Sequence, residues 1–261
     1  MHFIPLGLGD VALSIVLIGA VVLLSLWNKL GLEKDLVIGT VRTFVQLLAV
    51  GHILRFVFSL DHPWPVILVV LVMMAVAVYN GVRRQSAKFR GMTIAMSVSI
   101  AAATILVLFV VVVVVIKAKP WFEPQVVIPI AGMTIAASMN AATLGMNRLS
   151  ADLKLRKKEV EAALALGASP RVAVHPLLKD AAKSAMLPSI NALMIVGVVQ
   201  LPGMMSGQIL SGIDPIQAIN YQIVVMYMIC AAAAITSYAI LFQSYRKFFT
   251  SREQLLPGLF Q

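Results

Sequence analysis

Two short groups of residues combine the helix-breaking and metal-ligating types that an ion path through a membrane would need. They are Pro129, Gly132 and Met133, and Pro202, Gly203, Met204 and Met205. Proline and glycine loosen a membrane helix, and the carbonyl groups they free need partners or a cavity. Methionine sulfur is a soft metal ligand, and the amide oxygens of nearby Asn140 and Gln200 are harder ones. Packing or gating is the commoner role of such residues, because methionine also fills irregular gaps.

The chain carries no pattern for catalysis or nucleotide binding of its own. It lacks the G-x-x-x-x-G-K-[ST] loop that cradles phosphates. It also lacks the H-E-x-x-H and G-x-S-x-G motifs, so we expect no enzyme and no bound cofactor. All acidic residues fall in predicted loops or span ends, whereas ion-coupled transporters usually keep carboxylates within the membrane. The sequence therefore favours an external energy source; the alternative is an ion-coupled secondary transporter or a channel with no ATPase partner.

The composition predicts an all-α, polytopic integral membrane protein. The chain is 60% apolar and only 12% charged, far from the balance of soluble domains. Several charge-free runs are long enough to cross a bilayer as helices, which need about 18 or more apolar residues, and we expect about seven spans. The predicted spans are Asp10–Trp27, Val37–Ser59, Pro65–Gly81, Met92–Ile116, Gln125–Asn147, Ala185–Ser211 and Gln217–Phe242.

Lysine and arginine residues concentrate on one side of these spans. Of the 21, only Arg55, Lys117 and Lys119 fall on the side of the N-terminus, and Arg42 falls inside the second span. Cytoplasmic loops carry the excess of basic residues. We therefore expect the N-terminus outside and the C-terminus in the cytoplasm. The net charge of +10 then reports topology, and no nucleic-acid partner is expected.

Arg42 and Gln46 are polar residues inside the second span, one helical turn apart on the same face. Arg42 lies near the cytoplasmic edge, so its long side chain can reach the lipid headgroups. The alternatives are that it lines the inner mouth of a path or bonds the carbonyls of a neighbouring helix.

Two spans differ in the surface they offer to other helices. The fourth span carries consecutive valines from Val110 and no row of small residues, so we expect it to face lipid. The fifth carries two rows at a spacing that brings helices together: Gly132, Ala136 and Asn140, and Ala137, Ala141 and Gly145.

The longest connection, residues 148–184, is predicted to be cytoplasmic and amphipathic. Its first apolar residues recur at helical spacing: Leu149, Leu153, Val160 and Leu164. Gly167 is placed to end this helix, because glycine accepts the left-handed conformation that follows a helix. Ser169 is a good N-cap for a second helix. The pattern alone also fits a helix lying on anionic lipid.

The same connection resembles the EAA loop of ABC-transporter permeases. The resemblance rests on Glu161, Ala162 and Ala163, followed by Gly167. In that family the loop forms a coupling helix that docks into a groove of a separate ATPase subunit, and here Ser169 and Arg171 would fall in the coupling segment. The proline that follows in the family is missing at position 180, which indicates a divergent permease class.

Further segments resemble the FetB-like family of ABC-transporter permeases, whose relatives include plant aluminium-tolerance permeases. They are "LEKD" at Leu32–Asp35, "VIPIAGM" at Val127–Met133 and the stretch Leu201–Ile223. The resemblance implies one permease domain over residues 1–261, paired as a homodimer in a bacterial inner membrane. It implies export of iron or another metal ion, free or chelated, with ATP used by a partner ATPase.

Overall fold

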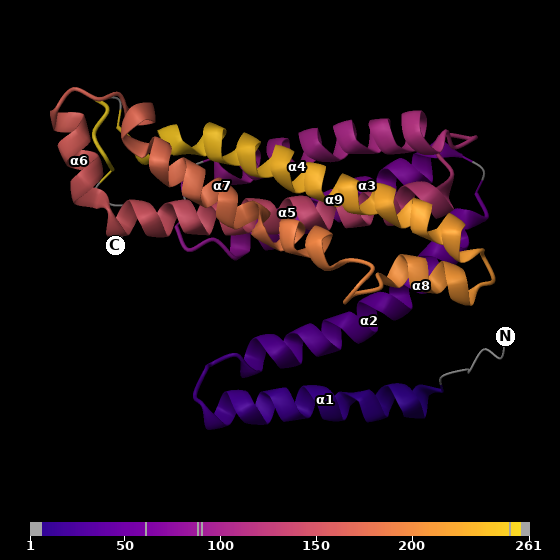
Figure 1. The fold of residues 1–261 in the computed structure, drawn as a ribbon. Helices are drawn as coiled ribbons and strands as arrows, with labels where there is room; N and C mark the ends of the chain where they lie inside the picture. The colour runs from indigo at the N-terminus through magenta and orange to yellow at the C-terminus, as the bar shows by residue number, and fades with distance from the viewer. Residues whose placement is uncertain (1–6, 61, 88, 90, 251, 257–261) are drawn as a thin grey trace. The chain divides into compact units, whose positions relative to one another are not determined.

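The computed structural model describes residues 7–60, 62–87, 89, 91–250 and 252–256, and the regular elements in them are helices (Figure 1). They are α1 (Leu8–Trp27), α2 (Glu33–Phe58), α3 (Pro63–Arg83), α4 (Met92–Leu108), η1 (a π-helix, Phe109–Ile116), α5 (Pro124–Leu155), α6 (Lys157–Ala165), α7 (Pro170–Ile195), α8 (Gly203–Leu210), α9 (Pro215–Ser244) and η2 (a 3₁₀-helix, Tyr245–Phe248). The chain forms two compact units, Met1–Asp61 and His62–Gln261. The first unit holds α1 and α2, and the second holds every later helix.

The protein is an all-helical membrane protein. Among the described residues, five helical segments are long and apolar enough to cross a membrane: Glu33–Phe58, Pro63–Arg83, Met92–Ile116, Pro124–Leu155 and Pro215–Phe248. Each overlaps one predicted span almost completely, and only Ser59, the last residue of the second span, lies beyond its helix. The first predicted span lies in α1, whose apolar segment Leu13–Trp27 is shorter.

The predicted sixth span, Ala185–Ser211, is not one continuous helix. α7 ends at Ile195, and Gly197 then adopts a φ of 84°, a conformation that a helix cannot contain. Pro202 supplies the N-cap residue of α8, and Gly203 is its first residue. The apolar run therefore divides into the end of one long helix, a link and a short helix, because apolar composition sets where a chain is buried but not where its backbone turns.

Pro129 and Gly132 do not interrupt α5, contrary to the prediction of a helix break there. Pro129 lies in the second turn of α5, where the missing N–H removes one backbone hydrogen bond near the helix end. Gly132 instead makes room for a neighbour, since a Cβ there would stand 2.9 Å from the terminal methyl of Met73 in α3. It is a packing position in a continuous helix.

The core of the second unit is centred on α5, which packs against α3, α4, α7 and α9. The prediction that the fourth span faces lipid is wrong for one side of that span. Met96, Ile100 and Ala103 of α4 are fully buried. Val111 and Val112 are buried as well, whereas Val113 is exposed. Because one face of this span covers α5 and α9, only its other face is free.

Candidate functional site

The best-defined candidate site is the end of the second unit where α5 finishes. There α6 runs across the ends of α5 and α7 (Figure 1). The turn after α6 (residues 166–169) is built on Gly167, whose φ is 88°. The N–H of Ala168 donates to the carbonyl of Ala163 at 3.0 Å, and the N–H of Gly167 donates to that of Leu164 at 3.0 Å. This is the Schellman pattern, in which glycine lets the chain leave a helix sharply.

The apolar side of α6 packs on protein. Val160 is 1% exposed and belongs to the same buried cluster as Leu149 and Leu153, with Leu164 packed against it. The predicted amphipathic helix from Leu149 is two elements, because the backbone leaves the helical conformation at Arg156 (φ −102°, ψ 23°). These side chains therefore anchor α6 to the core. In a helix lying on anionic lipid, they would instead face the bilayer.

The other side of α6 is exposed. Glu161 and Ala162 are exposed, and Ala163 is half-buried. The Glu161 carboxylate lies 3.6 Å from the Lys157 ammonium group on the same helix. A solvent-exposed pair of this kind contributes little stability, so both groups are available to a partner.

Leu166, which follows α6 directly, is 89% exposed, and sequence reasoning missed it. Single exposed leucines are common on protein surfaces, so it is the position of Leu166 at the tip of the predicted coupling segment that makes it a candidate contact. The sequence could have indicated this exposure, because Leu166 does not continue the helical spacing of Leu149, Leu153, Val160 and Leu164.

The second half of the predicted coupling segment begins α7. Ser169 occupies the N-cap position with an extended backbone, although its side chain forms no capping hydrogen bond with any described residue. Arg171 is exposed, and its guanidinium lies 5.7 Å from the ring centroid of Phe242 in α9. This cation–π contact joins the start of α7 to the end of α9.

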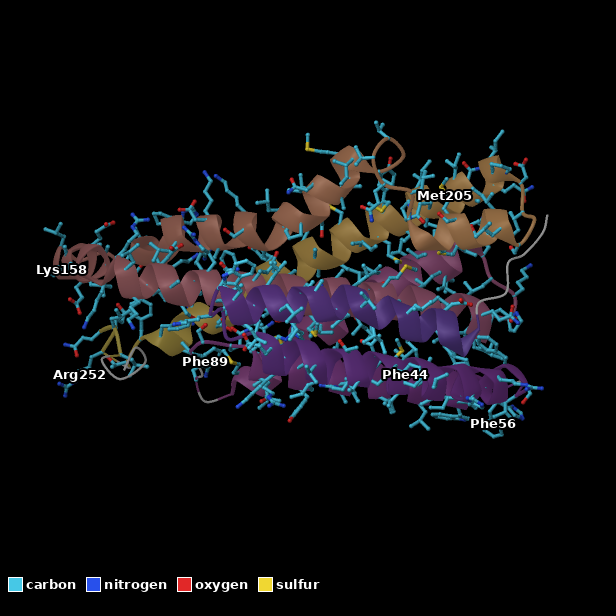
Figure 2. The ribbon with its side chains drawn as sticks, turned by 90° about the horizontal axis from the view of Figure 1, so that it is seen from below. Phe44, Phe56, Phe89, Lys158, Met205 and Arg252 are labelled. Atoms are coloured by element: carbon cyan, nitrogen blue, oxygen red, sulfur yellow. The ribbon has the colours of Figure 1, made fainter. Side chains whose placement is uncertain are left out.

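The predicted methionine groups meet in an apolar setting. Met133 of α5 and Met204 of α8 pack against one buried cluster, whose members are Val107, Val111, Ile130, Val225, Met228 and Ala232. Met205 is itself buried, and it lies at the end of the unit away from Lys158 of α6 (Figure 2). The structure therefore packs one methionine from each predicted group, Met133 and Met204, against the same apolar cluster.

Asn140 lies outside that apolar cluster. It is exposed on α5 and shares a stripe with Pro129, Met133 and Ala136, of which Met133 is the most covered. Its amide forms no hydrogen bond with another described residue, which is costly for a polar group at membrane depth unless water or a partner reaches it. Gln200 is also exposed, in the link between α7 and α8.

Two buried amide oxygens, one in α8 and one in α9, lack hydrogen-bond partners within the part of the chain that the structure describes. The Oε1 atoms of Gln208 in α8 and Gln222 in α9 are buried without a hydrogen-bond partner among the described residues. No group of three or more His, Cys, Asp or Glu side chains within the described ranges is placed to hold a metal ion.

Arg42 and Gln46 belong to the first unit, where both are exposed on α2.

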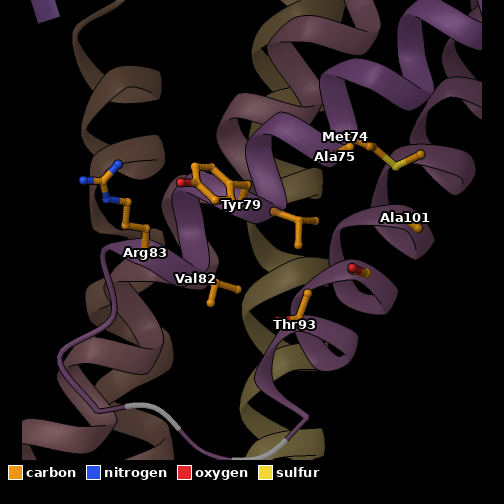
Figure 3. Close-up of a pocket in the computed structure, with 9 residues that line it drawn as sticks. Met74, Ala75, Tyr79, Val82, Arg83, Thr93 and Ala101 are labelled. Atoms are coloured by element: carbon orange, nitrogen blue, oxygen red, sulfur yellow. The ribbon is translucent and has the colours of Figure 1, made fainter. Parts of the chain in front are cut away.

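A separate cavity of about 700 Å³ lies between α3 and α4 (Figure 3). It is lined by Met74, Ala75, Val78, Tyr79, Val82, Arg83, Thr93, Ser97 and Ala101. Arg83 turns its guanidinium away from Thr93 across the cavity (Figure 3). None of the predicted site residues lines this cavity.

The helices and the comparisons with known proteins define a membrane permease. The Uncharacterised protein family (UPF0014) matches residues 8–249, so the chain belongs to this family. It is 35% identical to the "probable iron export permease protein FetB" of Escherichia coli over 95% of this chain and 94% of that protein.

Two other relatives are similarly close. The chain is 36% identical to the membrane protein YjkA of Bacillus subtilis over 94% of this chain and 97% of that one. It is 35% identical to the protein ALUMINUM SENSITIVE 3 of Arabidopsis thaliana over 97% of this chain and 92% of that one. No solved structure matches the chain.

Proposed function

We propose that this chain is the membrane-spanning subunit of an ATP-binding-cassette exporter driven by a separate ATPase subunit. The observation that carries the proposal is the α6–α7 turn. Val160 anchors α6 to the core, Gly167 turns the chain, and Leu166 projects 89% exposed from the tip. A firmly held helix that presents an apolar side chain and a mixed-charge face is suited to a groove on another protein.

The cargo is iron or another metal ion, free or as a chelate. This part of the proposal is supported by the name of the Escherichia coli relative and by the exposed amide groups of Asn140 and Gln200. These amides supply oxygen ligands, and Met133, Met204 and Met205 pack beside the path. Neutral oxygen groups bind a metal weakly enough to release it, as a transport path requires.

The proposed assembly is a homodimer in a bacterial inner membrane, with the N-terminus outside and the C-terminus in the cytoplasm. The concentration of basic residues on one side of the spans supports this orientation. One α6–α7 turn per chain makes half of a two-fold transporter, and cyclic dimers are the common closed assembly. The seven predicted spans would include α1 and the α7–α8 region besides the five long helical segments.

The test isolates the permease from its own cells with an affinity tag and identifies copurifying ATPase subunits by mass spectrometry. The complex is then placed in lipid vesicles, and ATP hydrolysis and metal export are measured for Leu166→Ser. Leu30→Ser is the control, because Leu30 is an exposed leucine (59%) in the connection between α1 and α2, outside the end of the second unit where α5 finishes. We expect Leu166→Ser to lose most coupled export and Leu30→Ser to keep it.

Two results would overturn the proposal. One is metal export by the permease alone, without ATP or any ATPase subunit, which is the behaviour of a secondary transporter or channel. The other is a Leu166→Ser permease that binds the ATPase and exports metal like the parent protein.

A further inference from the structure

The chain does not leave the bundle after α9 but folds back on itself. The C-terminal hairpin (residues 245–250 and 252–256) begins with η2. The N–H of Thr250 donates to the carbonyl of Gln254 at 2.7 Å, and the N–H of Leu256 donates to that of Phe248 at 2.9 Å. The Oγ1 atom of Thr250 also accepts from the N–H of Gln254 at 3.2 Å. These three hydrogen bonds hold the two arms of the hairpin together.

The C-terminal hairpin shares the core that holds α6. Phe248 is fully buried, and Phe249 and Leu255 are buried in the same cluster as Val160 of α6. The Phe248 ring also contacts Phe89, before α4, at 5.8 Å between centroids. Because one packed core holds both segments, the hairpin and α6 form one rigid surface.

Two hollows separate the C-terminal hairpin from the α6–α7 turn. The first, of about 640 Å³, is lined by Lys157, Glu161 and Gly167 on one side and by residues 252–255 on the other. The second, of about 820 Å³, is lined by residues 169–171 on one side and by residues 245–247 on the other. Glu253 lines both hollows. The hairpin and the turn therefore border one continuous, concave surface.

The exposed charges of this surface are mainly positive. The basic side chains are Arg171, Arg246, Lys247 and Arg252, and the acids among them are Glu161 and Glu253. Lys158 of α6 and Arg252 of the hairpin lie at the same end of the unit (Figure 2). A concave surface fits a protruding part of a folded protein better than it fits a flat bilayer, and its excess of basic side chains favours an acidic partner surface.

We propose that the C-terminal hairpin is a second docking element for the ATPase subunit, which binds it through an acidic patch while its groove receives the α6–α7 turn. This inference rests on the proposed function, because it assumes that the ATPase docks at α6. The resemblance to the EAA loop covers only the α6–α7 segment, so the charged contact at the C-terminal hairpin would be additional to it. Its contribution falls as ionic strength rises, because it depends on exposed charges.

The experiment measures binding of the copurified ATPase subunit to the full-length permease in nanodiscs. The test variant is Lys247→Gln/Arg252→Gln, and the control is Lys29→Gln/Lys34→Gln, which removes the same number of exposed positive charges from the α1–α2 connection. We expect the test variant to bind at least about fivefold more weakly and to lose part of the salt dependence. The control variant should bind like the parent protein.

The outcomes separate this inference from the proposed function. If Leu166→Ser weakens binding but the hairpin variant does not, the second docking element is refuted and the proposed function stands. If neither change weakens binding, both are refuted. If the hairpin variant leaves ATPase binding intact but reduces attachment of the isolated permease to vesicles rich in anionic lipid, the surface binds membrane and the inference is wrong.

Discussion

Gly145 of α5 lies so close to α7 that a Cβ atom at this position would stand 3.3 Å from the Cβ of Ala185. The carbonyl of Ala181 would be 3.8 Å from the same atom, and Leu241 of α9 would be 3.7 Å from it. The Ala185 methyl group and the Ala181 carbonyl cannot move aside as a flexible methionine can. The contact fixes the spacing of the two helices that are joined by α6.

A larger side chain at this contact should separate α5 from α7. We expect Gly145→Leu to lower the free energy of unfolding by about 1–3 kcal/mol through overpacking, and to reduce coupled ATP hydrolysis. Thermal unfolding in detergent measures the first effect. Gly207→Ala is the control, because Gly207 of α8 has nothing within 4 Å of its added Cβ. Equal melting temperatures for Gly145→Leu and the parent protein would contradict the packing argument.

The left-handed backbone at Gly167 predicts a specific loss of coupling. In Gly167→Ala the turn must adopt a conformation that costs roughly 1–2 kcal/mol for an L-residue, so the tip of α6 should shift. Gly212 is a matched control with a φ of 95° in the turn between α8 and α9. Both alanine variants should lose similar stability, whereas only Gly167→Ala should reduce ATPase-driven transport. Equal transport by the two variants would refute a special role for the turn.

The methionine groups can be tested by a change that keeps their volume. We expect the combined Met133→Leu/Met204→Leu/Met205→Leu variant to cost under about 1.5 kcal/mol of stability and to keep its metal-stimulated ATP hydrolysis, because Met133 and Met204 pack against an apolar cluster and Met205 is buried. Reconstituted complexes with and without metal provide the measurement. A loss of stimulation with unchanged basal hydrolysis would instead identify the sulfur atoms as ligands.

Asn140 provides the contrasting test. Its exposed amide is better placed than the buried Met205 sulfur to meet a passing ion. We expect Asn140→Leu to reduce metal stimulation of ATP hydrolysis severalfold while the protein stays folded, since the Asn140 side chain is exposed. Ala136→Leu on the same stripe is the control for added bulk. If both variants lose stimulation equally, steric blocking rather than ligation explains the effect.

Assembly can be measured without any substitution. We expect the purified permease to have the mass of two chains by native mass spectrometry in detergent, since a single α6–α7 turn per chain serves half of a two-fold transporter. The measurement is repeated on the complex that hydrolyses ATP. A complex that contains one permease chain and still couples hydrolysis to export would refute the homodimer.

Hydropathy located the long helices well. The predicted span Met92–Ile116 coincides with α4 and η1, and Gln217–Phe242 lies inside α9. A charge-free run has no alternative to burial in lipid or protein, so its extent can be read from residue types alone. The interruption at Gly197 could not be read in this way, because a glycine in an apolar run is compatible with both a helix and a turn.

Sequence could not show what each apolar face contacts. Val160 was predicted to belong to an amphipathic helix, and its spacing is the same whether the face lies on lipid or on protein. Val111 was predicted to face lipid, yet it is buried against the cluster that includes Ile130. Lipid tails and protein cores are equally apolar, so composition does not distinguish them. The exposure of Leu166 was likewise fixed by the path of the turn rather than by residue type.

The continuity of α5 gives the second unit one element that reaches from end to end. Its 32 residues make a rod of about 48 Å. Gly145, the close contact with α7, lies roughly 15 Å from Leu155 and 32 Å from Pro124 along this rod. Because α5 packs against α3, α4, α7 and α9, a displacement of its α6 end should be passed to all four neighbours together, and the second unit should respond as one body.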